Sequence, residues 1–335
     1  MHNINLLRKE LLNKQFFNES ILELINNEKW LQIWVPKEYG GLGLNFNEGL
    51  KKLLKIAQID GSLGWFVTLC SGANYFSRNL KPNIAKELFY NKKTCFGGSG
   101  MLGGTAEVNG DYYTINGLWH YATGAPYLTH YTLNAKITKQ GKEIIDEDGN
   151  NVFLSFILDK SQVTPISTWK SMGMVATASH SFEVNNQKIN KDYSFIYNNF
   201  YSKDLIEKVP FSIFADLTLL VNYIGMANHF LEKSLEIINY QVQIKLKKLI
   251  ENSTLQIDKY ALIIENKLLN NRKISEELEN EIHTFGEITV ENITKYIIDI
   301  YPHLGIKASK INDEINQIFR DYFTATQHKN FRKTI

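Results

Sequence analysis

The fold of this chain is decided by one stretch, Asn116-Gly117-Leu118-Trp119-His120-Tyr121-Ala122-Thr123-Gly124. The Asn-Gly pair that opens it is a strong signal for a hairpin turn. Residues i and i+2 of a strand point to the same face, so we expect Trp119, Tyr121 and Thr123 to line one side together. Ordinary core packing is the alternative for the two aromatic side chains, because aromatic residues dominate protein cores.

Strand-like sequence continues on both sides of this stretch, from Thr94 to about Tyr197. Short β-prone runs alternate there with turn signals such as Asn109-Gly110 and the polar loop at 146–150. The runs that are typical of strands cover residues 111–115, 131–137, 152–158 and 181–184. The whole segment therefore predicts a β domain.

Helical patterns occupy the chain before and after this segment. Before it, apolar residues recur at helical spacing in residues 6–26 and 45–60, and Pro82 suits the first turn of a short helix. After it, a helical pattern begins at Ser212 and continues through long segments. Breaks are expected near residues 252–253, 270–271 and 302–305. Long helices joined by short loops indicate a bundle.

The order of helix, strand and helix predicts an α+β multidomain chain. We expect an N-terminal α-helical domain at residues 1–91, a central β-barrel-like domain at 92–204 and a C-terminal α-helical bundle at 205–335. A chain of 335 residues with 44% hydrophobic content is long enough to build two or three domains of this kind.

Composition excludes several classes of function. The net charge is only +2, so no strong basic field exists to bind nucleic acid. Cys70 and Cys95 are too few for a disulfide framework, and we expect two reduced thiols in a cytosolic protein. Residues 1–5 show no secretory signal, and no stretch approaches the roughly 18 apolar residues of a spanning helix. We expect a soluble cytoplasmic protein with neither a membrane nor a nucleic acid as partner.

Two apparent motifs lose their meaning in context. Residues Gly98 to Gly103 match the dinucleotide pattern GxGxxG, but the residues that follow lead into a strand where that site needs a helix. A glycine-rich loop with a close backbone approach is the better interpretation. The histidines, among them His120, His130, His180 and His229, lack the spacing of metal ligands, so no metal site is expected.

Four segments, taken in order, resemble the acyl-CoA dehydrogenase superfamily of flavoproteins. They are Val35 to Gly43, the stretch Asn116 to Gly124 itself, Trp169 to Met174 running on to Thr177-Ala178-Ser179, and Arg320-Asp321 followed by His328. The likeness extends from about Trp30 to His328. It implies a helical domain, a β domain and a helical bundle, with a flavin, FAD or FMN, at their junction.

The resemblance also implies roles for single residues. An aromatic residue at the position of Tyr121 lies against the flavin ring in this superfamily, and a hydroxyl at the position of Thr123 contacts the ring near its reactive N5 edge. Ala122 lies between them. The loop that contains Cys95, Phe96, Gly97 and Ser99 would border the same ring. These seven residues are the expected flavin contacts.

Departures from the superfamily pattern point to its monooxygenase branch, which includes dibenzothiophene and hydroxyphenylacetate monooxygenases. The dehydrogenases need a carboxylate base, yet residues 321–328 contain no Glu, and Asp216 is only near the alternative position. The Arg-containing segment that grips FAD phosphates is missing at 240–243. Asp60 to Trp65 resembles the monooxygenase branch, although the His that often follows is absent from residues 71–74.

His328 is the candidate catalytic residue, because a histidine exchanges protons near neutral pH. It would hydrogen-bond a flavin intermediate or activate a phenolic substrate; the alternative is a histidine that caps the last carbonyls of its helix.

Three functions stay open. The first is a flavin-dependent monooxygenase that uses reduced flavin and oxygen on a small aromatic or acyl substrate. A separate flavin reductase would supply the reduced flavin. The second is an acyl-CoA dehydrogenase with an unrecognised base. The third is a catalytically silent homologue that binds a ligand or a protein. The resemblance further implies a homodimer or homotetramer.

Overall fold

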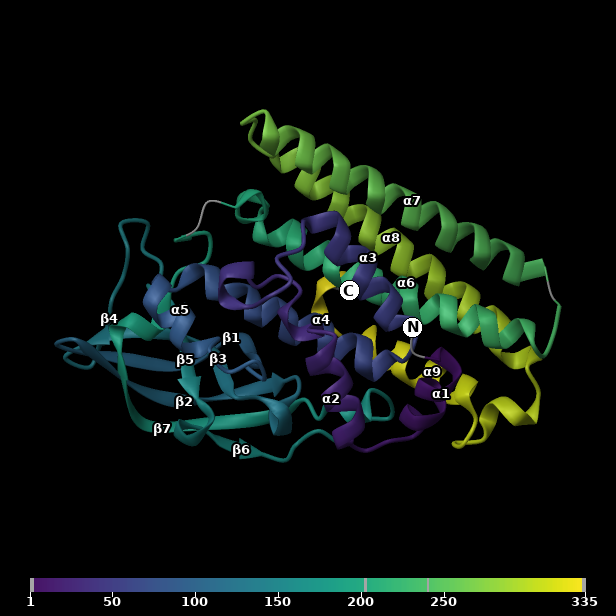
Figure 1. The fold of residues 1–335 in the computed structure, drawn as a ribbon, viewed down its shortest axis with the longest axis horizontal. Coiled ribbons are helices and arrows are strands. Elements are labelled where there is room, and N and C mark those ends of the chain that lie inside the picture. The colour runs from purple at the N-terminus through teal and green to yellow at the C-terminus, as the bar shows by residue number, and fades with distance from the viewer. Residues whose placement is uncertain (1–2, 202–203, 240, 333–335) are drawn as a thin grey trace.

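The computed structural model describes residues 3–201, 204–239 and 241–332. A β-sheet forms one end of the molecule and a group of long helices forms the other, with helix α4 (Gly61–Asn74) between them (Figure 1). The described chain therefore has the predicted order of helices, strands and helices.

The N-terminal part forms short helices: α1 (Ile4–Leu11), α2 (Glu19–Asn27), α3 (Phe46–Ala57), α4 and α5 (Pro82–Leu88). The helical stretch predicted at 6–26 is thus two helices with an irregular link. A capping box of Asn45 and Glu48 starts α3, and Pro82 occupies the first turn of α5 as expected.

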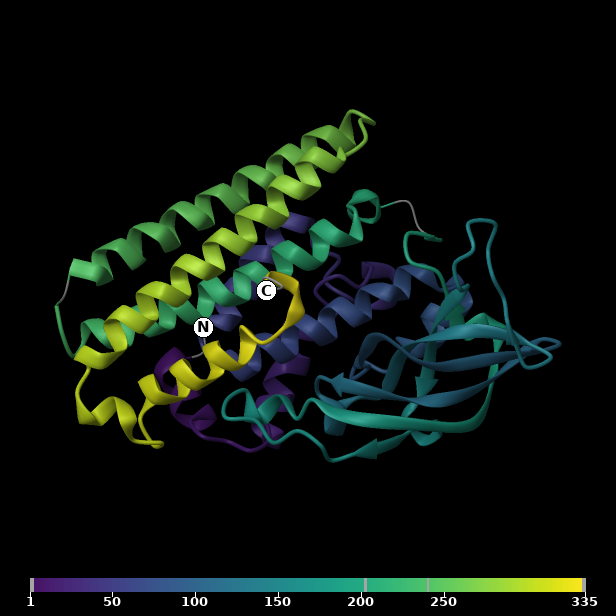
Figure 2. The ribbon, with the colours of Figure 1, turned by 180° about the vertical axis from the view of Figure 1, so that it is seen from behind.

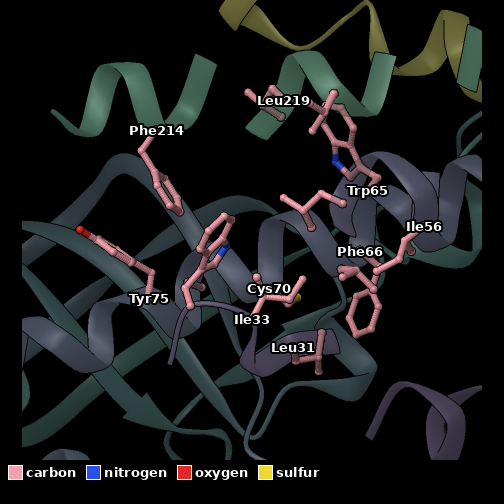
Figure 3. Packing of buried hydrophobic residues seen from close by; sticks show 14 of the residues in the cluster. Leu31, Ile33, Ile56, Trp65, Phe66, Cys70, Tyr75, Phe214 and Leu219 are labelled. Atoms are coloured by element: carbon pink, nitrogen blue, oxygen red, sulfur yellow. The ribbon is translucent and has the colours of Figure 1, made fainter. Parts of the chain in front are cut away.

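Helix α4 is buried on nearly all sides, which agrees with its lack of any charged residue. Its side chains pack against the N-terminal helices on one side and α6 on the other. Figure 3 shows Trp65, Phe66 and Cys70 of α4 among apolar residues from several elements, including Phe214. This helix is the structural link between the sheet and the bundle.

The sheet has eight strands: β1 (Phe96–Asn109), β2 (Tyr112–Ala122), β3 (His130–Lys139), β4 (Lys142–Glu143), β5 (Phe153–Asp159), β6 (Thr164–Ile166), β7 (His180–Asn190) and β8 (Ser194–Phe195). Their order is β6-β7-β2-β1-β3-β5-β8, with β4 added to β3. The barrel-like prediction is wrong in this respect, because the sheet is open. Its two ends are the very short strands β6 and β8, which pair with different neighbours and not with each other.

A β-bulge interrupts β2 inside the stretch that decides the fold. Trp119 lies opposite Phe182 and Ala122 lies opposite His180, so two residues of β2 face one residue of β7. Tyr121, the second of the two, has a left-handed φ of 65°. An extra residue inverts the alternation of a strand. Trp119 is therefore fully buried and Tyr121 is 65% exposed, and the prediction that they share a face is wrong.

The C-terminal part consists of α6 (Phe211–Leu235), α7 (Gln241–Leu269), α8 (Glu276–Ile300) and α9 (Glu314–Ala325). The first three run alongside one another, and the chain beyond α9 returns toward the middle of the molecule (Figure 2). The breaks predicted near 270–271 and 302–305 are confirmed. The break predicted near 252–253 is wrong, because Ser253 is buried in α7 and packing overrides the weak helix propensity of Asn and Ser.

Helix α6 is long and apolar enough to cross a membrane by composition, which the sequence interpretation overlooked. In the fold, 78% of its apolar window is buried inside the protein. Burial against other helices accounts for this composition, as in the central helix of a globular core.

Candidate functional site

The bulge in β2 presents an exposed aromatic ring beside a second one. The ring of Tyr121 lies edge-on to that of Trp169, with 6.5 Å between centroids and an interplanar angle of 82°. The indole Nε1 of Trp169 donates a hydrogen bond of 3.0 Å to the Met174 carbonyl, which fixes the orientation of the ring. The pair forms an aromatic ledge, defined here as Tyr121 and Trp169, that a flat ligand can stack against.

A chain of buried hydroxyl groups lies next to this ledge. Thr123 Oγ1 and Ser179 Oγ are 3.0 Å apart, and Ser179 Oγ is 2.9 Å from Thr177 Oγ1. The Thr177 hydroxyl donates in turn to the Met174 carbonyl at 2.8 Å. We call Thr123, Ser179 and Thr177 the hydroxyl chain. Its hydrogen bonds hold the end of β2 against the segment that enters β7.

The loop predicted to border the flavin points its side chains mostly inward. Cys95 and Phe96 are buried, and Phe96 packs against Phe89 and His130. A Cβ atom on Gly97 would lie 3.0 Å from the Thr123 carbonyl oxygen, so glycine permits a close approach of the two strands.

Ser99 is also mostly buried, and its hydroxyl accepts from the Met101 amide at 3.4 Å. Ala122 is fully buried. Residues 98–103 belong to β1 and enter no helix, which confirms that their GxGxxG pattern is not a dinucleotide site. Of the seven predicted flavin contacts, only Tyr121 presents a side chain that is largely exposed.

His328 begins the 3-10 turn Lys329–Phe331, and its Nδ1 accepts from the Asn330 amide at 3.4 Å. The imidazole therefore caps the turn that follows it, and the alternative that it caps the last carbonyls of α9 is wrong. Burial, with the nearby Lys329 charge, lowers the pKa of His328 below its usual value. A neutral ring that accepts at Nδ1 carries its proton on Nε2, which leaves that N–H available as a donor.

Helix α4 joins the two halves of the candidate site. The ring of Trp65 lies edge-on to His328, with centroids 5.5 Å apart. Five residues later, the Cys70 thiol donates to the Thr123 carbonyl at 3.5 Å. Within the described residues, no hydrogen bond or ring contact links His328 directly to Tyr121. The structure thus connects His328 to the hydroxyl chain through α4.

Polar contacts that sequence reasoning missed anchor the chain around His328. Asn330 donates its side-chain amide to Asp216 Oδ1 at 2.7 Å, and His283 Nδ1 lies 3.1 Å from Asp216 Oδ2. Burial raises the pKa of Asp216, although both of these partners oppose the rise. Asp216, considered as a base from the sequence, is therefore engaged on both carboxylate oxygens. No local sequence pattern predicts these contacts, because Asp216, His283 and Asn330 lie far apart in the sequence.

Metal ligands are not assembled anywhere in the described ranges: no group of three or more His, Cys, Asp or Glu side chains there is placed to hold an ion. The chemistry available at this site comes from aromatic surface, hydroxyl groups and one imidazole.

The sequence is similar to those of several curated monooxygenases, whereas no family model matches it. It is 26% identical over 202 residues to an indole-3-acetate monooxygenase of Pseudomonas putida, which covers 59% of this chain and 50% of that protein. It is 23% identical over 223 residues to a dibenzothiophene monooxygenase of Rhodococcus qingshengii, which covers 62% of this chain and 52% of that one. The chain spans about half the length of the curated relatives it matches.

Solved structures match over almost the whole chain. A 3-HSA hydroxylase from Rhodococcus sp. RHA1 has a TM-score of 0.87 at 15% identity and covers 98% of this chain and 91% of its own. The chain has the fold of these enzymes. XiaF from Streptomyces sp., in complex with FADH2 and glycerol, has a TM-score of 0.86 at 15% identity, with 98% and 89% covered. TdsC from Paenibacillus sp. A11-2, with FMN and indole, has a TM-score of 0.77 at 16% identity, with 97% and 91% covered.

Proposed function

We propose that this chain is a flavin-dependent monooxygenase that uses reduced flavin and oxygen on a small aromatic substrate. The observation that supports this most is the aromatic ledge at the bulge, with the hydroxyl chain directly behind it. A left-handed, non-glycine residue costs conformational energy and is common at ligand sites, so an exposed Tyr121 in this conformation fits a binding role. The names of the similar proteins agree with the proposal.

The residues of the site fit a flavin ring in their chemistry. Tyr121 would stack on its face beside the edge-on ring of Trp169, and Thr123 would orient its edge through a hydroxyl fixed by Ser179. A flavin, when bound, supplies the redox chemistry. The Nε2–H of His328, whose Nδ1 accepts from the Asn330 amide, would be the group of this chain that donates or moves a proton. Cys95, Phe96, Gly97, Ser99 and Ala122 would contribute backbone and packing around the same ring.

The remaining features of the proposal follow the resemblance. Reduced flavin would come from a separate reductase, and the chain would form a homodimer or homotetramer in the cytoplasm. We also propose the division into domains at residues 1–91, 92–204 and 205–335. Sedimentation of the purified protein tests the oligomeric state.

Flavin binding is the decisive experiment. The purified protein is titrated anaerobically with reduced FMN and reduced FAD, and oxygen consumption is then followed with each flavin and a panel of small aromatic compounds. We expect binding of one flavin and substrate-dependent oxygen uptake. If neither flavin binds, the proposed function is wrong and a silent binding protein is favoured.

Replacing Tyr121 by alanine is expected to weaken binding of reduced flavin about fivefold to tenfold, because the stacking surface is worth about 1–1.4 kcal/mol. Quenching of protein tryptophan fluorescence in an anaerobic titration measures the change. Tyr112→Ala is the matched control, since Tyr112 is a part-exposed tyrosine of the same strand that packs under Lys188. Equal effects of the two substitutions would contradict the assignment of the ledge.

A dehydrogenase is the second candidate, because a 3-(aryl)acrylate reductase of Clostridium sporogenes is also similar, with 27% identity over 193 residues that cover 52% of this chain and 49% of that protein. Its base would have to be Asp216, whose two carboxylate oxygens are already engaged. Anaerobic bleaching of protein-bound oxidised flavin by an acyl thioester would favour this candidate over the monooxygenase.

A further inference from the structure

Three consecutive residues, Met172, Gly173 and Met174, contact helix α9. The Arg320 guanidinium donates from Nη1 to the Met172 carbonyl at 2.7 Å. A Cβ atom on Gly173 would lie only 2.1 Å from the Arg320 carbonyl oxygen, so the two backbones are in contact. The Met174 amide donates to Asp321 Oδ1. These contacts fasten residues 172–174 to Arg320 and Asp321.

The fastened segment determines the geometry of the candidate flavin site. Met174 has a left-handed φ of 51°, a conformation that a bulky residue adopts only when its surroundings impose it. Its carbonyl oxygen accepts from both Trp169 Nε1 and Thr177 Oγ1. Trp169 belongs to the ledge and Thr177 to the hydroxyl chain that ends at Thr123. The position of one carbonyl therefore sets both parts of the site.

The carboxyl group of Asp321 lies near a second buried carboxyl group, that of Asp60. The side chain of Asp321 is buried, and its Oδ2 has no hydrogen-bond partner among the residues that the structure describes. Asp60, the N-cap of α4, is also buried beside it and accepts from the Leu63 amide at 2.9 Å and from Gln317 Nε2 at 2.7 Å. A small cavity that both Asp60 and Asp321 line has room for about one water molecule.

The charged groups around this cavity leave the two carboxyls without a cation of their own. Arg8 from α1 is paired with Glu232 at 2.7 Å and lies 3.8 Å from Glu314. His229 from α6 is hydrogen-bonded to Glu314 at 2.7 Å. On α9 itself, Arg320 directs its guanidinium to Met172, Asn13 and Asn316.

Two adjacent buried carboxylates cannot both ionise without a large penalty. Burial raises the pKa of Asp60. Burial first, and the charge of Asp60 second, raise the pKa of Asp321 to about 8. A carboxyl whose pKa rises on folding stabilises the fold most at low pH and loses that contribution as the pH rises through the folded value. Near neutral pH the pair therefore retains one proton.

We propose that Arg320 and Asp321 are positioning residues that lock Met174, and through it Trp169 and Thr123. One proton held by the pair of carboxyls, Asp321 and Asp60, is part of the lock, and we call it the shared proton. The effect on flavin rests on the proposed function, whereas the lock itself is a property of the chain alone. Loss of the shared proton places two like charges side by side and loosens the segment at 169–179.

Hydrogen exchange of the flavin-free protein tests the lock directly. Wild type is compared with Asp321→Asn, which keeps an acceptor for the Met174 amide and mimics the neutral acid, and with Asp321→Leu, which has no acceptor. We expect Asp321→Leu to exchange amides at 169–179 about tenfold faster, while Asp321→Asn stays within about twofold of wild type. Asp313→Asn is the matched control, because it is the same change on the N-cap of the same helix.

The pH dependence tests the shared proton. After correction for intrinsic exchange, wild type is expected to lose protection at 169–179 between about one pH unit below and one unit above the pKa of Asp321. Asp321→Asn is expected to show no such loss. If it shows the wild-type loss, the shared proton is wrong. Exchange of amides in the centre of α6 reports whether the whole protein unfolds. If Asp321→Leu does not fold, Arg320→Met provides a milder variant.

Flavin titration then separates the lock from the proposed function. We expect Asp321→Leu and Arg320→Met to raise the Kd for reduced flavin about tenfold. As the pH rises through the pKa of Asp321, we expect the Kd of wild type to rise and the Kd of Asp321→Asn to stay constant. If wild type binds no flavin, the proposed function fails and exchange alone decides the lock. Unchanged exchange at 169–179 in both Asp321→Leu and Arg320→Met would overturn the lock even if flavin binds.

Discussion

Replacing His328 by alanine is expected to lower substrate-dependent oxygen uptake by about 10²–10⁴-fold, which is the usual contribution of a general acid or base. The imidazole is positioned by the Asn330 amide and by the ring of Trp65, and no described residue accepts a hydrogen bond from its Nε2–H. Alanine removes that proton and leaves the aromatic ledge untouched. Flavin affinity is therefore expected to change by less than about threefold, since the change acts on proton transfer and not on stacking.

The pH profile gives this prediction its sign. Burial lowers the pKa of His328, so the neutral ring is the resting form at neutral pH. As the pH falls below that value the ring takes a second proton, and Nδ1 can no longer accept from the Asn330 amide. We expect wild-type kcat/KM to decline on the acid side of neutrality and the residual activity of His328→Ala to lack that limb.

His303→Ala is the control for this experiment, because His303 is an exposed histidine in the turn after α8. Its activity should match wild type. A loss of thermal stability in His328→Ala with turnover per folded molecule unchanged would mean that the imidazole only caps its turn. Rescue of part of the activity by added imidazole would support the proton-transfer role.

The sequence allowed the large-scale order to be predicted because that order depends on local patterns. Helical spacing at 45–60 and the proline at Pro82 led to α3 and α5 directly. The open sheet was not predicted, since closure depends on whether the edge strands β6 and β8 meet, and no local pattern encodes that contact. The continuous helix through Ser253 was not predicted either, because Ser253 is buried by packing against neighbouring helices.

The candidate site shows the same division. Tyr121 and Thr123 were singled out from the sequence, yet the bulge between Trp119 and Ala122 depends on how β7 pairs with β2. The hydroxyl partner of Thr123 is Ser179, 56 residues later, and the acceptor for the Met174 amide is Asp321, 147 residues later. Contacts at such separations belong to the tertiary fold, and local patterns in a single sequence give no sign of them.

Replacing Trp119 by alanine is expected to lower the free energy of unfolding by about 3–5 kcal/mol, the usual cost of removing a large buried aromatic side chain. The indole is fully buried, stacks on Phe182 with centroids 5.5 Å apart, and donates from Nε1 to the Asn134 carbonyl at 2.9 Å. Alanine would leave a cavity between β1, β2 and β7 and an acceptor without its donor. Urea denaturation with an unchanged m-value measures the loss.

Tyr121→Ala is the variant against which the free energy of unfolding of Trp119→Ala is compared. The two aromatic residues are two positions apart, and a regular strand would put both on one face with similar effects on stability. The bulge separates them, so Tyr121→Ala should change the free energy of unfolding by less than about 0.5 kcal/mol while it weakens flavin binding. Trp119→Phe should fall between the two, because it keeps the stacking on Phe182 and loses the hydrogen bond. Equal destabilisation by both alanine substitutions would mean that β2 continues without a bulge. The exposed ledge, and the flavin site proposed on it, would then lose their structural basis.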